Sequence, residues 1–186
     1  SFSAICVALA GTSPSTSAFL RMLYALPALA LITMFQRNRT RPGRRALRLA
    51  VSAGVVFALN ITVWHYNIDL IGTGLSTVMG NAQIVFIGLI AWLLFSERPT
   101  RAALTLIPVM LGSILLISGV LEEPGLGEAP VLGAVLGVLT AALNAAWLLL
   151  FREATRSTRN TPAVLLVLTG VAVVVTLAAS VIDPGF

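Results

Sequence analysis

The sequence predicts an all-α, polytopic bundle of transmembrane helices, and its composition, its long apolar runs and the placement of its arginines support this. Of the 186 residues, 58% are hydrophobic and only 10% are charged, and the mean hydropathy is +0.96. A soluble domain is about 45–50% apolar and about 25% charged. The composition therefore disfavours a water-soluble enzyme, a disordered tail and a nucleic-acid-binding domain. The apolar runs are too long for membrane strands and lack their alternation.

Six apolar runs are long enough to cross a bilayer, because a helix needs roughly 20 residues to span a hydrocarbon core of about 30 Å. A seventh run, 2–10, would cover only about 14 Å as a helix, so we expect the parent reading frame to begin at least roughly ten residues before Ser1. The six runs are 15–36, 46–68, 71–95, 100–121, 131–151 and 162–182.

The arginines predict how the chain is oriented. Eleven of the twelve lie in three alternate loops, 37–48, 96–101 and 152–160, whereas the opposite loops have no arginine and hold five of the seven acidic residues. Positive charge gathers in cytoplasmic loops, so these three loops are predicted to be cytoplasmic in a multi-pass protein of the inner (plasma) membrane. The arginine run could instead bind nucleic acid or lipid, but runs beside spans usually anchor topology. We therefore expect no nucleic-acid partner.

Small and capping residues predict how the helices begin and pack. Thr161 before Pro162 predicts a capped helix start. Two stripes of small residues predict close helix packing, because small side chains let backbones approach each other. The stripes are Gly72, Ser76 and Gly80, and Gly133, Gly137 and Ala141.

Polar side chains within the spans are the candidates for a substrate cavity, because polar groups in a bilayer usually face a bundle interior or water. Asn81 and Gln83 lie near the middle of their span and point about 200° apart. Interhelical hydrogen bonding, aromatic belts and core packing are the alternative explanations. The span candidates are Asn60, Trp64, Asn81, Gln83, Asn144 and Trp147.

Arg21 and His65 are two further candidates, placed nearer the outer mouth. An arginine within a span is costly unless it is paired or hydrated. Arg21 therefore either extends to the outer surface or faces a water-filled cavity, where it would attract carboxylates. His65 and Asp69 are four residues apart on one helix and could pair.

The sequence lacks the residues that an enzyme or a metal site would need. One cysteine and one histidine cannot form a zinc site of the usual kind. No nucleophile and base are spaced for catalysis, and no lysine is present to bind retinal. We therefore predict no catalytic residues, no metal and no cofactor.

Several motifs resemble those of one transporter family. The stretch 13–21, the run 60–66, the run 74–83 and the exit 94–100 resemble successive spans of EamA-domain proteins of the drug/metabolite transporter superfamily, and 133–152 resembles the opening span of a second copy. The resemblance implies two inverted five-helix repeats around a central cavity. Residues 1–121 would be the first repeat, with a truncated first helix. Residues 122–186 would begin an incomplete second repeat, so about three more helices are expected after Phe186.

The resemblance implies transport of a small metabolite or drug-like compound, in the direction of export, by alternating access. The expected partners are a small-molecule solute and the lipid bilayer, and the oligomeric state stays open, a homodimer included. The alternative is a non-transporting membrane scaffold or assembly subunit. Such a protein would use the small-residue stripes for helix packing alone.

Overall fold

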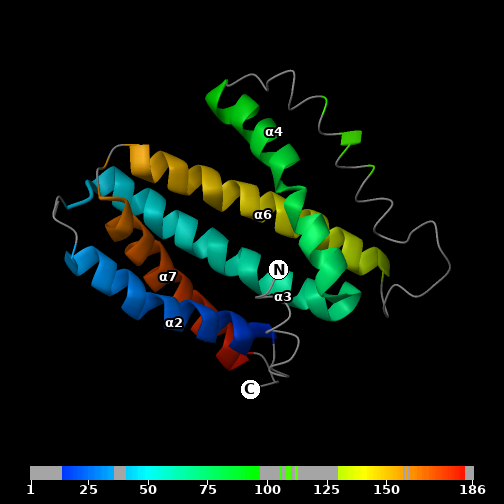
Figure 1. The fold of residues 1–186 in the computed structure, drawn as a ribbon, viewed down its shortest axis with the longest axis horizontal. Coiled ribbons are helices and arrows are strands. Elements are labelled where there is room, and N and C mark those ends of the chain that lie inside the picture. Colours follow the sequence, from blue (N-terminus) through cyan, green and yellow to red (C-terminus); the bar gives the residue numbers. More distant parts are fainter. Residues whose placement is uncertain are drawn as a thin grey trace. The chain divides into compact units, whose positions relative to one another are not determined.

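The structure is a computed structural model, and it confirms the all-α prediction. It describes residues 14–35, 41–96, 105, 108, 109, 112, 130–156, 158 and 160–182 (Figure 1). These residues contain helices and short connections and no strand. The helices are α2 (Pro14–Phe35), α3 (Arg44–Asn81), α4 (Gln83–Phe95), α6 (Pro130–Arg156) and α7 (Thr161–Ile182).

The described helices include five segments that are long and apolar enough to cross a membrane, so the chain is a multi-pass membrane protein. Three of them, in α2, α6 and α7, match predicted spans. The helix α6 continues to Arg156, so the first residues of the predicted loop 152–160 are helical. The predicted runs 2–10 and 100–121 lie wholly or mostly outside the described residues, and so does most of the loop 96–101.

The predicted boundary between the spans 46–68 and 71–95 was misplaced. Residues 69–70, expected to connect them, are helical, and the break comes at Gly72, with φ 79° and ψ 166°. This backbone conformation is essentially restricted to glycine. Gly72 therefore serves as a turn between the candidate spans Arg44–Gly72 and Gly74–Leu93.

The described residues form two compact units, and the long helices α3 and α6 contribute to both. Unit 1 contains α3 from Val63 onward, α4, and α6 through Ala145. Unit 2 contains α2, α3 through Thr62, α6 from Ala146 onward, and α7.

Small side chains hold unit 2 together. The helices α2 and α7 lie against each other (Figure 1). One core cluster joins α2, α3 and α7, and a second joins α3, α6 and α7. Alanine at these contacts lets the backbones approach closely, as in other membrane bundles. The buried members are Ala18, Met22, Ala58, Ile61 and Ala172 in the first cluster, and Ala50, Ala154 and Val164 in the second.

Ion pairs connect the arginine-rich ends of two helices in unit 2. Arg45 at the start of α3 donates from Nη2 to Glu153 Oε1 of α6 at 3.0 Å. Arg156 Nη1 lies 3.5 Å from the other carboxylate oxygen of Glu153. Because both arginines are largely exposed, water screens these pairs and each contributes at most about 1 kcal/mol.

The start of α7 corrects a sequence prediction. Asn160, rather than Thr161, caps the helix, because its Oδ1 accepts a hydrogen bond from the backbone N–H of Ala163 at 3.2 Å. Asparagine is among the strongest helix-capping residues, since its side chain satisfies a backbone N–H that has no partner within the helix.

Gly54 lies at a close approach of α3 to α7 that was not predicted from the sequence. A Cβ atom at this position would lie 2.6 Å from the carbonyl oxygen of Leu168 and 2.8 Å from Val171 Cβ. We expect Gly54→Ala to lower the free energy of unfolding by about 1–3 kcal/mol, because the backbone of α7 would have to move.

The matched control is Gly170→Ala in α7, where no described atom lies within 4 Å of the added carbon. This change is expected to leave stability unchanged or to raise it, since alanine favours helix. Thermal unfolding in detergent measures both variants. Equal melting temperatures for the two would contradict the close contact.

In unit 1, glycines of the predicted stripe Gly133, Gly137 and Ala141 bring α6 close to the second part of α3. A Cβ at Gly133 would collide with Ile71, and one at Gly137 would lie 2.7 Å from Met79 Sδ. Ala141, the third member, is fully buried. This stripe is confirmed as a close-packing surface.

The other predicted stripe does not pack in this way. No described atom lies within 4 Å of a Cβ built at Gly72 or Gly80. Ser76, between them, is fully buried. Gly72 is needed for its positive φ, and close packing by Gly72 or Gly80 is not seen against the described residues.

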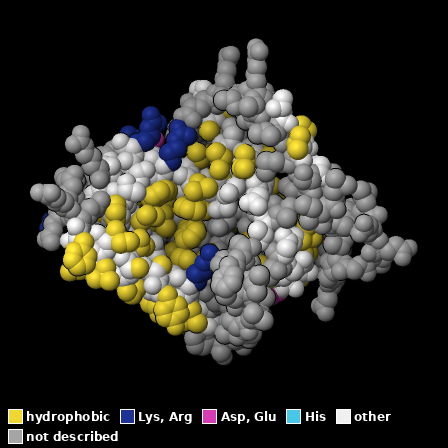
Figure 2. All heavy atoms as spheres, viewed as in Figure 1, with side chains coloured by type: hydrophobic (Ala, Val, Ile, Leu, Met, Phe, Trp, Pro, Cys, Tyr) yellow, Lys and Arg dark blue, Asp and Glu magenta, His cyan; other side chains and the backbone are white. Residues whose placement is uncertain are grey.

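The outer face of α2 is apolar and suited to lipid. Figure 2 shows hydrophobic side chains gathered over this helix. Leu31 and Ile32 are each 54% exposed, and Phe35 at its end is 85% exposed. A large exposed apolar surface on a helix of this length is expected to contact the hydrocarbon of a bilayer.

Candidate functional site

The candidate span Gly74–Leu93 has a local break in its regular helical hydrogen bonds near its middle, where α3 meets α4, and this break is called the interruption. The two helices are separated at Ala82, where the backbone forms a tight turn. The N–H of Ala82 donates to the carbonyl of Met79, and the N–H of Val85 donates to the carbonyl of Ala82, each at 3.0 Å. Ala82 keeps right-handed helical angles, φ −60° and ψ −10°, so the helix tightens here and does not unwind. A short tightened stretch of this kind inside a helix often marks a functional hinge or local strain.

Asn81 and Gln83 flank this interruption and have different surroundings, as their angular separation predicted. The side chain of Asn81 is exposed, whereas that of Gln83 is partly buried. Within the described part of unit 1, the Oε1 atom of Gln83 is buried and accepts no hydrogen bond. The interruption therefore presents one accessible amide and one buried acceptor that has no donor among the described residues.

Asn67, which was not predicted as a site residue, is a buried polar residue of unit 1. Its side chain is fully buried, and neither its Oδ1 nor its Nδ2 has a hydrogen-bond partner among the described residues. Burying an unsatisfied polar group costs roughly 1–3 kcal/mol. Such a group is usually explained by water, an ion or a ligand. Its signal in the sequence was an amide within an apolar span.

Ser76 is a second residue of this kind that was considered only for packing. It is fully buried, and its Oγ has no partner within the described residues. Ser76 lies four residues after Gly72, and Asn67 lies five residues before Gly72. These separations correspond to about 6 Å and 7.5 Å of helix on the two sides of the turn.

Other predicted candidates of unit 1 lie on α3 and α6. His65 is buried, at 1% exposure, and its ring meets that of Trp64 edge to face, with centroids 5.1 Å apart. On α6, Asn144 is partly buried. Asp69, the predicted partner of His65, is exposed.

The remaining candidates belong to unit 2. Asn60 is buried, at 7% exposure. The ring of Trp147 packs against Phe57, with centroids 4.7 Å apart, and lies 6.4 Å from that of Phe151. Trp147 thus makes the core packing that was its alternative explanation. Arg21 lies seven residues into α2 and has an exposed side chain.

The polar groups at the interruption and at Asn67 can bind a solute through neutral hydrogen bonds. Amides both donate and accept, and hydroxyls do the same. Among the described residues, no cluster of three His, Cys, Asp or Glu side chains could hold a metal ion. Several apolar spans with polar side chains inside them are compatible with a membrane protein that binds a polar solute.

Comparison with known families identifies the class directly. The model of the EamA-like transporter family matches residues 1–119. The chain belongs to this family, which is part of the drug/metabolite transporter superfamily, and is therefore a membrane transporter of that type. No curated protein and no solved structure matches the chain significantly.

Proposed function

We propose that the protein exports a small solute bearing neutral polar groups from the cytoplasm, by alternating access. The observation that carries this proposal is the local break at Ala82 in the span Gly74–Leu93, which has an exposed amide at Asn81 and, at Gln83, a buried acceptor without a partner among the described residues. A solute that leaves water must exchange its hydration for fixed donors and acceptors. These two side chains can supply them without introducing a charge into the membrane.

Asn67 and Ser76 extend this proposed site within unit 1. Both are fully buried and lack partners among the described residues, as a group reserved for solute or for cavity water would. We also propose that the polar and aromatic candidates from the sequence line the cavity. They are Asn60, Trp64, Asn81, Gln83, Asn144, Trp147, Arg21 and His65.

Counterflow in proteoliposomes tests the proposal. Vesicles loaded with an unlabelled compound are diluted into a trace of the same compound carrying a label, across a panel of metabolites and drug-like compounds. The protein is expected to accumulate label for at least one neutral polar member of the panel. A scaffold or assembly subunit would match protein-free vesicles throughout.

We further propose that loops 37–48, 96–101 and 152–160 are cytoplasmic in the inner membrane, from the distribution of arginine. In a Cys6→Ala background, a cysteine replacing Thr158 is expected to react with an impermeant thiol reagent only after permeabilisation. A cysteine replacing Gly127 should react in intact cells. The reverse pattern would overturn the orientation.

A further inference from the structure

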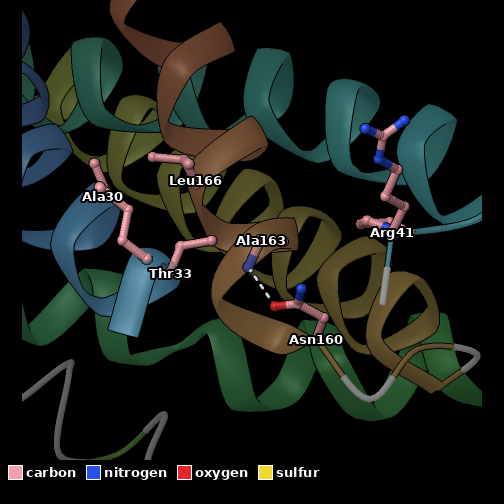
Figure 3. Close-up of a pocket in the computed structure, with 8 residues that line it drawn as sticks. Ala30, Thr33, Arg41, Asn160, Ala163 and Leu166 are labelled. Carbon is pink, nitrogen blue, oxygen red and sulfur yellow. Dashed lines mark hydrogen bonds between the residues drawn. The ribbon is translucent and has the colours of Figure 1, made fainter. Parts of the chain in front are cut away.

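Unit 2 contains a cavity of about 400 Å³ at its arginine-rich end. The cavity lies between the last turns of α2, residues 41–42 before α3, and the first turns of α7 (Figure 3). Its volume is within the range of about 300–1,000 Å³ that is typical of ligand sites. The lining residues are Ala30, Thr33, Met34, Arg41, Pro42, Asn160, Ala163 and Leu166.

The walls of the cavity suit a hydrocarbon chain. Five of the eight lining residues are apolar. The hydroxyl of a sixth, Thr33, is already bonded, because its Oγ1 donates to the carbonyl of Leu29 at 2.7 Å. The Oδ1 of Asn160 is engaged in capping α7, as the dashed line in Figure 3 marks. A solute rich in polar groups would lose hydration here without compensation.

The edge of the cavity carries positive charge. Arg41 lies across the cavity from Ala30 and Thr33, and its guanidinium is turned away from Asn160 (Figure 3). Its side chain is exposed, and it makes no ion pair with a described residue, in contrast to Arg45, which Glu153 neutralises at 3.0 Å. A guanidinium presents planar donors that match a phosphate.

The cavity also lies at the depth where hydrocarbon gives way to headgroups. Beside the cavity, the candidate span of α2 ends at Phe35 and the candidate span of α7 begins at Thr161. Met34 on the cavity wall and the neighbouring Phe35 are 66% and 85% exposed, so the apolar wall continues onto the lipid-facing surface of α2.

We propose that this cavity binds one acidic phospholipid, with an acyl chain between α2 and α7 and the phosphate at Arg41. Charge complementarity selects the acidic headgroup, and the apolar walls retain the chain. Basic pockets between membrane helices on the cytoplasmic side bind acidic lipids in this way. The site is separate from the proposed solute site and does not depend on it, because all its lining residues belong to unit 2.

Native mass spectrometry of the purified protein tests the charge requirement. Phosphatidylglycerol and phosphatidylethanolamine with identical chains are titrated in parallel, and glycerol phosphate serves as the free-anion probe. Arg41→Gln is expected to lower the preference for phosphatidylglycerol about fivefold, the factor that corresponds to ~1 kcal/mol for one basic residue at the membrane surface. Arg48→Gln, an equal charge change on an exposed residue outside the cavity, should change it less than about twofold.

A second pair of variants tests the cavity itself and does not rely on charge. Ala30→Phe fills the cavity and is expected to reduce the occupancy of both lipids, whereas Ala28→Phe, on the exposed face of the same helix, should not. Equal losses from Arg41→Gln and Arg48→Gln would overturn the proposal in favour of diffuse attraction. Displacement of the lipid by glycerol phosphate would overturn it in favour of a free-anion site.

Discussion

Asn67→Leu is expected to stabilise the protein while removing most of its transport. Neither polar atom of Asn67 has a partner among the described residues, and the side chain is fully buried. Replacing an unsatisfied buried amide by an apolar group of similar size relieves a penalty of roughly 1–3 kcal/mol. A solute hydrogen bond worth ~1.4 kcal/mol would be lost at the same time, which corresponds to a tenfold fall in affinity.

Melting temperature in detergent and flux per folded molecule in proteoliposomes measure the two effects. The matched control is Thr176→Val, which removes another buried polar group from a different helix. Thr176 is fully buried, but its Oγ1 already donates to the carbonyl of Ala172 at 2.8 Å. The control should therefore retain wild-type flux. If Asn67→Leu instead lowers the melting temperature and keeps flux, Asn67 serves packing and not solute.

Asn81→Leu is expected to lower flux about five- to thirtyfold, with little change in melting temperature. Asn81 lies beside the interruption at Ala82 and is exposed, so leucine there disturbs no described core contact. A solute bound at the interruption would lose an amide that can both donate and accept, which is worth about 1–2 kcal/mol.

The two alternatives for Asn81 give different results. An amide that only joined helices would leave affinity intact and lower the melting temperature when replaced. An amide facing lipid would cost free energy in the wild type, so leucine would raise the melting temperature and leave flux unchanged. Either result would remove Asn81 from the proposed site.

The sequence predicted the spans well because bilayer thickness sets the length of an apolar run independently of tertiary contacts. It misplaced the turn at Gly72, since Asp69 and Leu70 are compatible with helix and only the glycine permits the observed φ of 79°. The break at Ala82 was not foreseen, because alanine is the strongest helix former and nothing local marks the interruption.

The site was only partly predictable for a related reason. Amides within apolar spans identify candidates, but burial and the lack of a partner depend on neighbouring helices. Asn67 was not predicted on that account, and the packing of the Trp147 ring on Phe57 was predicted only as an alternative to a cavity role. The close contact at Gly54 also depends on α7, which is more than 100 residues distant in the chain.

The proposed function requires that Asn67, the buried amide of unit 1, and Asn81, the amide at the interruption, bind the transported solute. Counterflow by the wild type and by the double variant Asn67→Leu/Asn81→Leu, normalised to folded protein, tests it most directly. We expect wild-type vesicles to accumulate the labelled solute. Vesicles with the folded double variant should accumulate about a tenth of the wild-type level or less, since a tenfold loss corresponds to ~1.4 kcal/mol. Equal accumulation by the two proteins would contradict it.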